Sequence, residues 1–223
     1  MKELIKLWKS FGVFDKVYTI VFTLSLISVQ LITDSTLVSL VCALLGIGHV
    51  ILVRKGHRYA MILGAIQALF YCIISFKAKI YGDFMLNAYN VFFLTCGFIE
   101  WKNNSKGNQV KIMKLTKAKA IEVVICTAVI YASLVIILDV WGGFNPCLDA
   151  TTTTLCIVGV WLMTNRYIEC WIAFNLNNLI SVVLWLTLLM NGNSNAPVMM
   201  FMFGCYLVNS IYATIQWLQQ IKK

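Results

Sequence analysis

Residues 118–140 read AKAIEVVICTAVIYASLVIILDV, an apolar stretch that only Lys119, Glu122 and Asp139 interrupt with charge. A helix of this length can cross a hydrocarbon layer about 30 Å thick, which takes roughly 17–25 residues. Lipid offers no hydrogen-bond partners to a peptide backbone, so the segment has to be helical. The stretch therefore predicts a transmembrane helix.

Similar runs fill the rest of the chain. Of its 223 residues, 60% are hydrophobic and 12% are charged, and its mean hydropathy is +0.81. The other predicted spans are 17–33, 36–53, 59–77, 83–101, 148–164, 170–190 and 196–218. These runs do not alternate polar and apolar residues, as the strands of a transmembrane β-barrel do. The sequence predicts an all-α integral membrane protein of about eight transmembrane helices.

The basic residues predict the orientation of the chain. With the N-terminus placed inside, sixteen of the 18 Lys and Arg residues fall on the inner side, and only Lys77 and Lys79 fall outside. Positive charge concentrates in cytoplasmic loops, so we expect a multi-pass protein with both termini in the cytoplasm. The net charge of +9 follows from this bias and from attraction to anionic lipid. Nucleic acid is not expected as a partner.

One long polar segment, 102–117, separates three spans from a lone span and three more. A shift of 111 residues places Gly48 on Gly159, and a shift of 116 places Trp101 on Trp217. Both triplets begin outside, so they form parallel repeats, a transporter architecture with the substrate between the halves. We predict an amphipathic lead-in and extra helix (1–33), a first three-helix repeat (34–101), a basic inner loop and linker helix (102–147), a second repeat (148–218) and a cytoplasmic tail (219–223).

Ionisable residues are scarce within the spans. All nine acids lie in loops or at span ends, which favours facilitated diffusion, because intramembrane acids usually serve as ion relays. His49 lies well inside a span and is interpreted as a packing residue rather than a functional one. The two histidines form no HExxH motif and the cysteines no CxxC pair. The sequence therefore indicates no enzyme, catalytic residue, metal or cofactor.

The span 170–190 begins CWIAFNLNNLISVVLW. At 100° per residue, one stripe about 80° wide contains Trp171, Phe174, Asn178, Ser181 and Trp185. Its polar side chains need partners, which neighbouring helices could supply as interhelical hydrogen bonds. Aromatic walls with a few fixed amides also suit a flat polar ligand, and a cationic ring would gain cation–π attraction. We favour the ligand site over the interhelical alternative.

Further candidates come from other spans. Gln67 coincides with Asn178 in the repeat overlay, and the spans 83–101 and 196–218 contribute amides and tyrosines. The predicted substrate contacts are Trp171, Phe174, Asn178, Ser181, Gln67, Asn90, Asn209 and Tyr212.

The stretch LMTNRYIECW at 162–171, followed by Phe174, Asn178 and Ser181, resembles the signature of the PnuC family of vitamin transporters. Tyr81-Gly82-Asp83 and Gly97-Phe98-Ile99-Glu100-Trp101 resemble two further family stretches, and the likeness spans about residues 34–218. The resemblance implies a bacterial inner-membrane protein with two SWEET-like three-helix units joined by a linker helix, often as a homotrimer. It also implies uptake of nicotinamide riboside by facilitated diffusion, with trapping by a cytoplasmic kinase that phosphorylates the vitamin.

Position by position, Trp171 and Asn178 match the first Trp and the Asn of the family pattern WxxWxxxN. Phe174 stands where the second Trp is usual, Gln67 where an Asn is usual, and Leu94 where an amide is usual. These departures surround the expected site and leave a deoxynucleoside or thiamine open as the substrate. An integral-membrane binding or scaffold protein that transports nothing is the alternative from another class.

Overall fold

The computed structural model describes residues 11–33, 37–77, 81–142, 145–191 and 196–221. Eight long helices occupy these residues, one for each predicted span. They are α2 (Val13–Thr33), α3 (Leu37–Arg54), α4 (Ala60–Lys77), α5 (Tyr81–Asn103), α6 (Lys117–Val140), α7 (Pro146–Thr164), α8 (Cys170–Met190) and α9 (Ala196–Ile221). The all-α fold is confirmed, whereas the predicted amphipathic lead-in at 1–10 lies outside the described residues.

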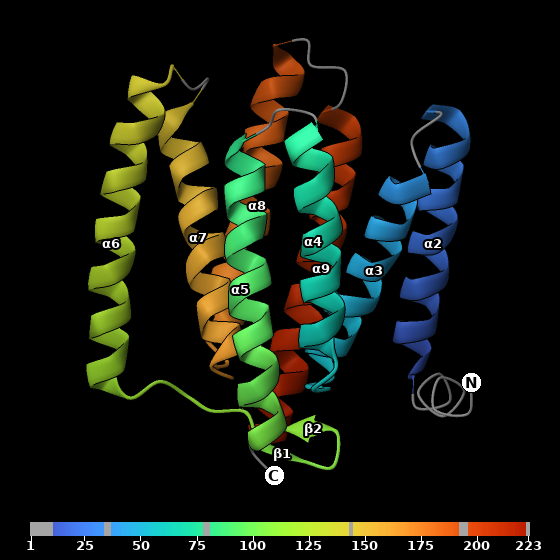
Figure 1. The fold of residues 1–223 in the computed structure, drawn as a ribbon, viewed down its shortest axis with the longest axis vertical. Helices are drawn as coiled ribbons and strands as arrows, with labels where there is room; N and C mark the ends of the chain where they lie inside the picture. Colours follow the sequence, from blue (N-terminus) through green and yellow to red (C-terminus); the bar gives the residue numbers. More distant parts are fainter. Residues whose placement is uncertain (1–10, 34–36, 78–80, 143–144, 192–195, 222–223) are drawn as a thin grey trace.

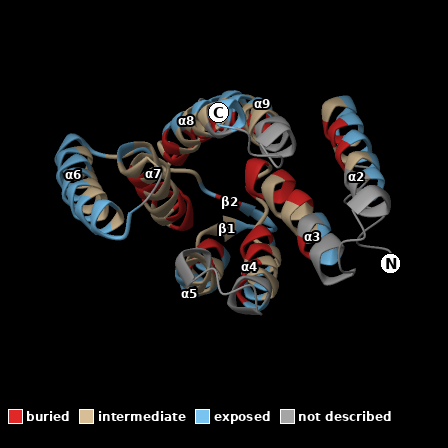
Figure 2. Ribbon diagram, turned by 90° about the horizontal axis from the view of Figure 1, so that it is seen from above, coloured by how far each residue is buried: buried red, intermediate tan, exposed pale blue. Residues whose placement is uncertain are grey.

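Six of these helices form a closed ring. Each packs against the next in the order α3, α4, α5, α7, α8, α9, and α9 packs back against α3. Seen from above, the buried residues of α3 and α7 face the inside of this ring (Figure 2). Helix α2 lies outside the ring against α3, and α6 lies outside it against α7 (Figure 1).

The outermost helices expose apolar side chains. Helix α6 has no buried residue, and its Ile121, Val124 and Ile136 are all more than 60% exposed. An apolar surface of this kind suits contact with lipid. Among the described residues, α6 and α7 are long and apolar enough to cross a bilayer, and shorter apolar helical stretches run over Leu44–Arg54, Ala60–Ile73 and Cys170–Leu184.

The α3–α4 and α7–α8 turns have the same geometry. Gly56 and Arg166 adopt φ of 65° and 67°, and their backbone N–H groups donate to the carbonyls of Val53 and Met163 at 2.8 and 2.9 Å. The left-handed conformation costs a residue with a Cβ about 1–2 kcal/mol. The Arg166 guanidinium is held in place by Glu100 Oε1 at 2.8 Å. The matching turns support the predicted repeat, which stays a prediction.

The basic inner loop folds into a short hairpin that the sequence did not predict. Strand β1 (Ser105–Lys106) pairs antiparallel with β2 (Gln109–Val110). The N–H of Val110 donates to Gly56 O at 2.8 Å, and the N–H of Met113 donates to Arg166 O at 2.9 Å. The loop thus ties together both interhelical turns at one end of the molecule, the end at which α2 begins and α9 finishes (Figure 1).

The core beside the site is aromatic. Trp101, Trp171 and Trp217 are each at most 3% exposed. The Trp171 and Trp217 rings lie 5.3 Å apart and nearly perpendicular, and the Trp101 and Trp217 rings lie 6.2 Å apart. Because Trp171 also lines the cavity described below, this core fixes one wall of the candidate site.

Candidate substrate-binding site

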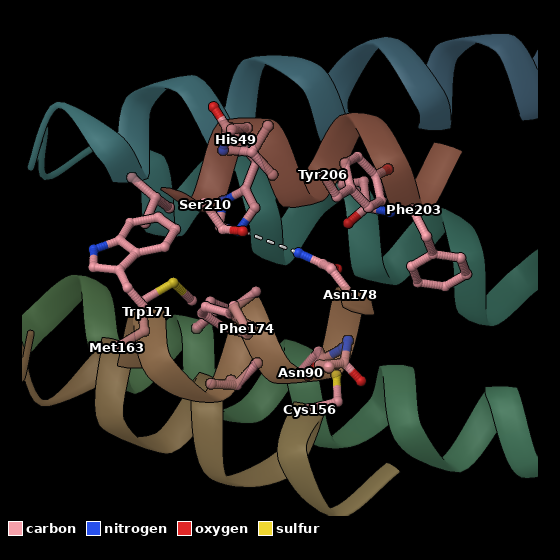
Figure 3. A pocket seen from close by; sticks show the side chains of 17 residues that line it. His49, Asn90, Cys156, Met163, Trp171, Phe174, Asn178, Phe203, Tyr206 and Ser210 are labelled. Carbon is pink, nitrogen blue, oxygen red and sulfur yellow. Dashed lines mark hydrogen bonds between the residues drawn. The ribbon is translucent and has the colours of Figure 1, made fainter. Parts of the chain in front are cut away.

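A cavity of about 280 Å³ lies inside the helix ring, and all six ring helices line it. Its size is just below the usual range of ligand pockets, roughly 300–1,000 Å³. None of the lining residues that the structure describes comes from α2 or α6. The lining residues are His49, Val50, Val53, Gln67, Asn90, Leu94, Cys156, Val160, Met163, Trp171, Phe174, Asn177, Asn178, Phe203, Tyr206, Asn209 and Ser210 (Figure 3).

The cavity brings together six of the eight residues predicted to bind substrate. They come from four different helices and are Gln67, Asn90, Trp171, Phe174, Asn178 and Asn209. Ser181 is buried further along α8 and does not line the cavity. Tyr212 packs instead on Phe14 of α2, with ring centroids 4.2 Å apart, and the Arg54 guanidinium lies 5.1 Å from its ring. Ser181 and Tyr212 therefore lie outside the cavity lining.

Several lining residues were not in the predicted set. His49, Phe203 and Ser210 reach the cavity from α3 and α9. Asn177 and Tyr206 carried a polar signal in the sequence, since they stand on the same spans as predicted contacts. The face of α9 that turns inward depends on its packing against α3 and α8, which helical periodicity alone does not give.

Trp171 and Phe174 form an aromatic wall. Their rings lie 5.9 Å apart at an interplanar angle of 62°. Trp171 is 3% exposed, and its Nε1 donor is buried without a hydrogen-bond partner among the described residues. An electron-rich wall of this kind attracts flat aromatic ligands, and cationic ones most strongly.

Asn178 both joins two helices and lines the cavity. Its Nδ2 donates to Ser210 Oγ at 3.2 Å, which links α8 to α9 (Figure 3). The same side chain lines the cavity. One turn earlier, Asn175 makes a parallel link to Thr214 Oγ1 at 3.1 Å but does not line the cavity. Interhelical bonding and ligand contact are thus combined at Asn178, whereas Asn175 shows interhelical bonding alone.

Two amide oxygens in the lining lack hydrogen-bond partners. Asn90 Oδ1 and Asn209 Oδ1 are buried and unpaired within the described part of the chain. A buried polar atom left without a partner costs about 1–3 kcal/mol. The two oxygens, on α5 and α9, are therefore suited to accept hydrogen bonds from N–H or O–H groups of a bound ligand.

His49 is both a packing residue and part of the lining. Its Nδ1 lies 2.8 Å from the carbonyl oxygen of Ala60. A carbonyl can only accept, so Nδ1 carries the proton, and Nε2 of the neutral ring is left as an acceptor. The hydrogen-bonded packing role expected from the sequence is present, and the ring also reaches the cavity.

The lining carries no formal charge apart from this titratable histidine. None of the described residues that line the cavity is Lys, Arg, Asp or Glu. In the described parts of the chain, no group of three or more His, Cys, Asp or Glu side chains could hold a metal ion. The arrangement can bind a flat ring with neutral polar edges.

Comparisons with known proteins agree with this arrangement. A family model described as nicotinamide mononucleotide transporter matches residues 36–219. The nicotinamide riboside transporter PnuC of Neisseria mucosa is 32% identical over 198 residues, covering 85% of this chain and 74% of that protein. The namesake from Haemophilus influenzae is 27% identical, covering 100% of this chain and 96% of that protein.

A solved structure shows the same fold. The crystal structure of the vitamin B3 transporter PnuC superposes with a TM-score of 0.78 at 28% identity, covering 96% of this chain and 94% of that one. The family match spans well over half of the chain, and the fold has its counterpart in a solved transporter structure. The chain belongs to the PnuC family of nicotinamide riboside transporters, and it is a multi-pass inner-membrane transporter rather than an enzyme.

Proposed function

We propose that this protein imports nicotinamide riboside by facilitated diffusion through the cavity of the helix ring. The observation that carries the proposal is the lining itself, which combines an aromatic wall of Trp171 and Phe174 with unpaired amide oxygens. The two relatives named above are nicotinamide riboside transporters by name. The lining has the chemistry that a pyridinium carboxamide joined to a ribose requires.

Each part of the riboside has a partner in the lining. The positively charged pyridinium ring gains cation–π attraction from Trp171 and Phe174. Asn178 has an amide oxygen available for the carboxamide N–H₂, because its bond to Ser210 uses Nδ2. Asn90 and Asn209 offer acceptors to ribose hydroxyls. Gln67 contributes a further amide from α4, which lies across the helix ring from α8.

The lining also favours the riboside over its phosphorylated form. A phosphate needs Arg, Lys or clustered N–H donors to replace its hydration. The described lining offers no Lys or Arg, so a mononucleotide phosphate in this cavity would be desolvated without a cationic partner. The substrate class that we propose is therefore a nucleoside with an aromatic base and a ribose that carries no phosphate.

Facilitated diffusion is supported by where the acids lie. The described carboxylates lie at or near helix ends, including Asp15 in the first turn of α2, Glu100 in the last turn of α5 and Glu169 in the α7–α8 turn. Ion relays within membranes use titratable Asp, Glu or His side chains. The described lining contains no carboxylate and one histidine, His49, whose Nδ1 lies 2.8 Å from the carbonyl oxygen of Ala60. Without coupling, net import requires removal of the product inside, so we propose that a cytoplasmic kinase phosphorylates the riboside. The phosphate then prevents return through a cavity without cations.

We also propose that both termini face the cytoplasm. The end of the molecule with the β1–β2 hairpin bears most of the basic loop residues, including Lys102, Lys106 and Lys111. Helix α2 begins and α9 finishes at that same end (Figure 1). Cytoplasmic placement of this end would satisfy the preference of basic loops for the inner side.

Calorimetric titration of the purified protein tests the substrate. Nicotinamide riboside should bind, nicotinamide mononucleotide should bind at least about tenfold more weakly, and thiamine and thymidine should give no comparable heat. Tighter binding of the mononucleotide than of the riboside would contradict the argument from charge. Binding of thymidine or thiamine alone would indicate that Phe174, Gln67 and Leu94 mark a changed substrate. Binding without any transport in liposomes would favour a scaffold protein.

A further inference from the structure

We propose that Gly159 is a positioning residue that sets the width of the substrate cavity. Gly159 lies on α7, is buried and does not itself line the cavity. Its missing side chain lets the ring of Phe174 lie directly against the α7 backbone. The inference rests on the proposed function, because Phe174 is the wall on which the substrate ring would stack.

The geometry leaves no room for a larger residue. A Cβ at position 159 would lie 2.7 Å from Cε1, 3.0 Å from Cδ1 and 3.1 Å from Cζ of Phe174. The shortest of these separations is closer than real Cβ contacts. One edge of the Phe174 ring therefore occupies the space in which the side chain of any other residue would begin.

The direction in which the ring can move connects this contact with the substrate. Phe174 lies between the α7 ribbon and the open centre of the cavity (Figure 3). Helix α7 blocks one side, so a ring displaced from Gly159 moves toward the cavity or toward Trp171, 5.9 Å away. Either movement narrows a space of only about 280 Å³. Gly159 therefore acts on the substrate through Phe174, without touching it.

The chain contains a matched control in its first half. A Cβ at Gly48 of α3 would lie 2.7 Å from Cδ2 of Leu63, the same separation as at Gly159. Gly48 and Leu63 precede Gly159 and Phe174 by 111 residues each. Leu63 does not line the cavity. An alanine at 48 therefore makes an equally short closest contact, against the terminal methyl of a side chain that is not part of the cavity lining.

The experiment compares Gly159→Ala with Gly48→Ala in the purified full-length protein. Thermal unfolding measures packing strain, and calorimetric titration measures the Kd for nicotinamide riboside. We expect both variants to lose thermal stability, but only Gly159→Ala should raise the Kd, by about tenfold or more. In a Phe174→Ala background there is no ring to displace, so Gly159→Ala should leave the already weakened Kd unchanged. A Kd raised equally by both glycine variants, or raised again in the Phe174→Ala background, would overturn the proposal.

Two further measurements test the role of Gly159 even if the substrate differs from nicotinamide riboside or if Gly159→Ala does not fold. With 4-fluorophenylalanine at position 174, Gly159→Ala should shift the ligand-free ¹⁹F resonance, whereas Gly48→Ala should not. This holds even if the wild-type protein binds no riboside, an outcome that contradicts only the proposed function. An unmoved resonance overturns the positioning role. If Gly159→Ala does not fold, the Gly159→Ala/Phe174→Ala variant should fold. If neither variant folds, glycine is required at position 159 for a reason other than the Phe174 ring, which would overturn the proposal.

Discussion

The indole nitrogen of Trp217 donates a hydrogen bond to the backbone carbonyl of Arg54, 2.8 Å away and 163 residues earlier in the chain. Trp101 makes the reciprocal bond to the carbonyl of Met163 at 3.0 Å. The last helix of each triplet thus holds the end of the first helix of the other triplet. Both indoles are fully buried. Their bonds join the two triplets next to Val53 and Met163, which line the cavity.

Replacing either indole by phenylalanine should destabilise the protein. Trp217→Phe and Trp101→Phe keep an aromatic ring but remove the donor. Trp217→Phe removes the hydrogen bond to the buried Arg54 carbonyl, at a cost of about 1–3 kcal/mol. Trp101→Phe should cost less, because the Met163 carbonyl still accepts from the Arg166 N–H at 2.9 Å. Circular-dichroism melts in detergent should show the loss. Trp141→Phe is the control, since Trp141 is 76% exposed and should change stability by less than about 0.5 kcal/mol. If all three variants had the same melting temperature, the reciprocal bonds would not contribute to stability.

Removing the charge of Asp15 should also be strongly destabilising. Asp15 of α2 pairs with Arg54, whose side chain is fully buried, and Phe14 and Tyr212 lie 5.0 and 5.1 Å from its guanidinium. Asp15→Asn leaves a buried cation without its counter-charge, which costs about 3–5 kcal/mol.

Two comparisons separate this ion pair from a general effect of charge. Replacing Asp15 and Arg54 together, as Asp15→Leu/Arg54→Met, should recover part of the stability, because an apolar pair needs no counter-charge. Recovery should be incomplete, since Lys55 Nζ, 2.8 Å from Asp15 Oδ2, also loses its partner. Glu122→Gln breaks the exposed pair with Lys119, 3.5 Å apart, and should cost at most about 1 kcal/mol. An Asp15→Asn variant that melts like the wild type would show that α2 is not held through this pair.

Acidification should lower the stability of the fold through protonation of His57, which lies in the α3–α4 turn. Burial, and then the charges of Arg58 and Lys55, lower the pKa of His57 below its ordinary value of 6.5. In the unfolded chain the ring therefore takes up its proton at higher pH than in the folded protein. The stability associated with neutral His57 is present above about pH 6.5 and is lost as the pH falls through the folded-state pKa.

The variant His57→Gln removes this titration. Thermal unfolding measured between pH 7.5 and pH 5 should fall less steeply for the variant than for the wild type, while other titrating groups contribute equally to both. A steeper fall for the variant would mean that the folded protein favours protonated His57, opposite to the expected sign.

Asn178→Ala should weaken the binding of nicotinamide riboside by about 1–3 kcal/mol, because a polar group of the ligand loses its partner. Asn175→Ala is the matched control on the same helix. Asn175 bonds Thr214 across the same α8–α9 contact but does not line the cavity. Its loss should lower the melting temperature with little change in Kd, as calorimetric titration can show. Equal effects on Kd would indicate that both amides act only by joining the helices.

The helices were predictable because hydropathy and length act locally. The predicted span 118–140 differs by one residue from α6, which begins at Lys117 after the capping residue Thr116. The predicted start at 148 was two residues late, because Asn145 caps α7 and Pro146 occupies its first turn. The β1–β2 hairpin was not predicted, since two-residue strands of polar sequence show no periodicity.

The site was predictable only where one helix determined it. Trp171, Phe174 and Asn178 share a face of α8, and helical periodicity brought them together before any packing was known. Ser181 shares that face but lies beyond the cavity. Helical periodicity predicts the face on which a side chain lies, but not how far along the helix the cavity extends. Tyr212 is turned toward Phe14 and Arg54 by the docking of α2, and contacts between such distant segments leave no periodic signal. The role of Gly159 likewise depends on the approach of two helices.

The most direct test of the account is the uptake of labelled nicotinamide riboside into proteoliposomes without any ion gradient. We predict saturable entry that stops when the internal concentration equals the external one, and continued entry when a riboside kinase and ATP are enclosed. Entry no faster than into protein-free liposomes would contradict transport of this substrate. Accumulation above the external concentration that requires a proton or sodium gradient would contradict facilitated diffusion.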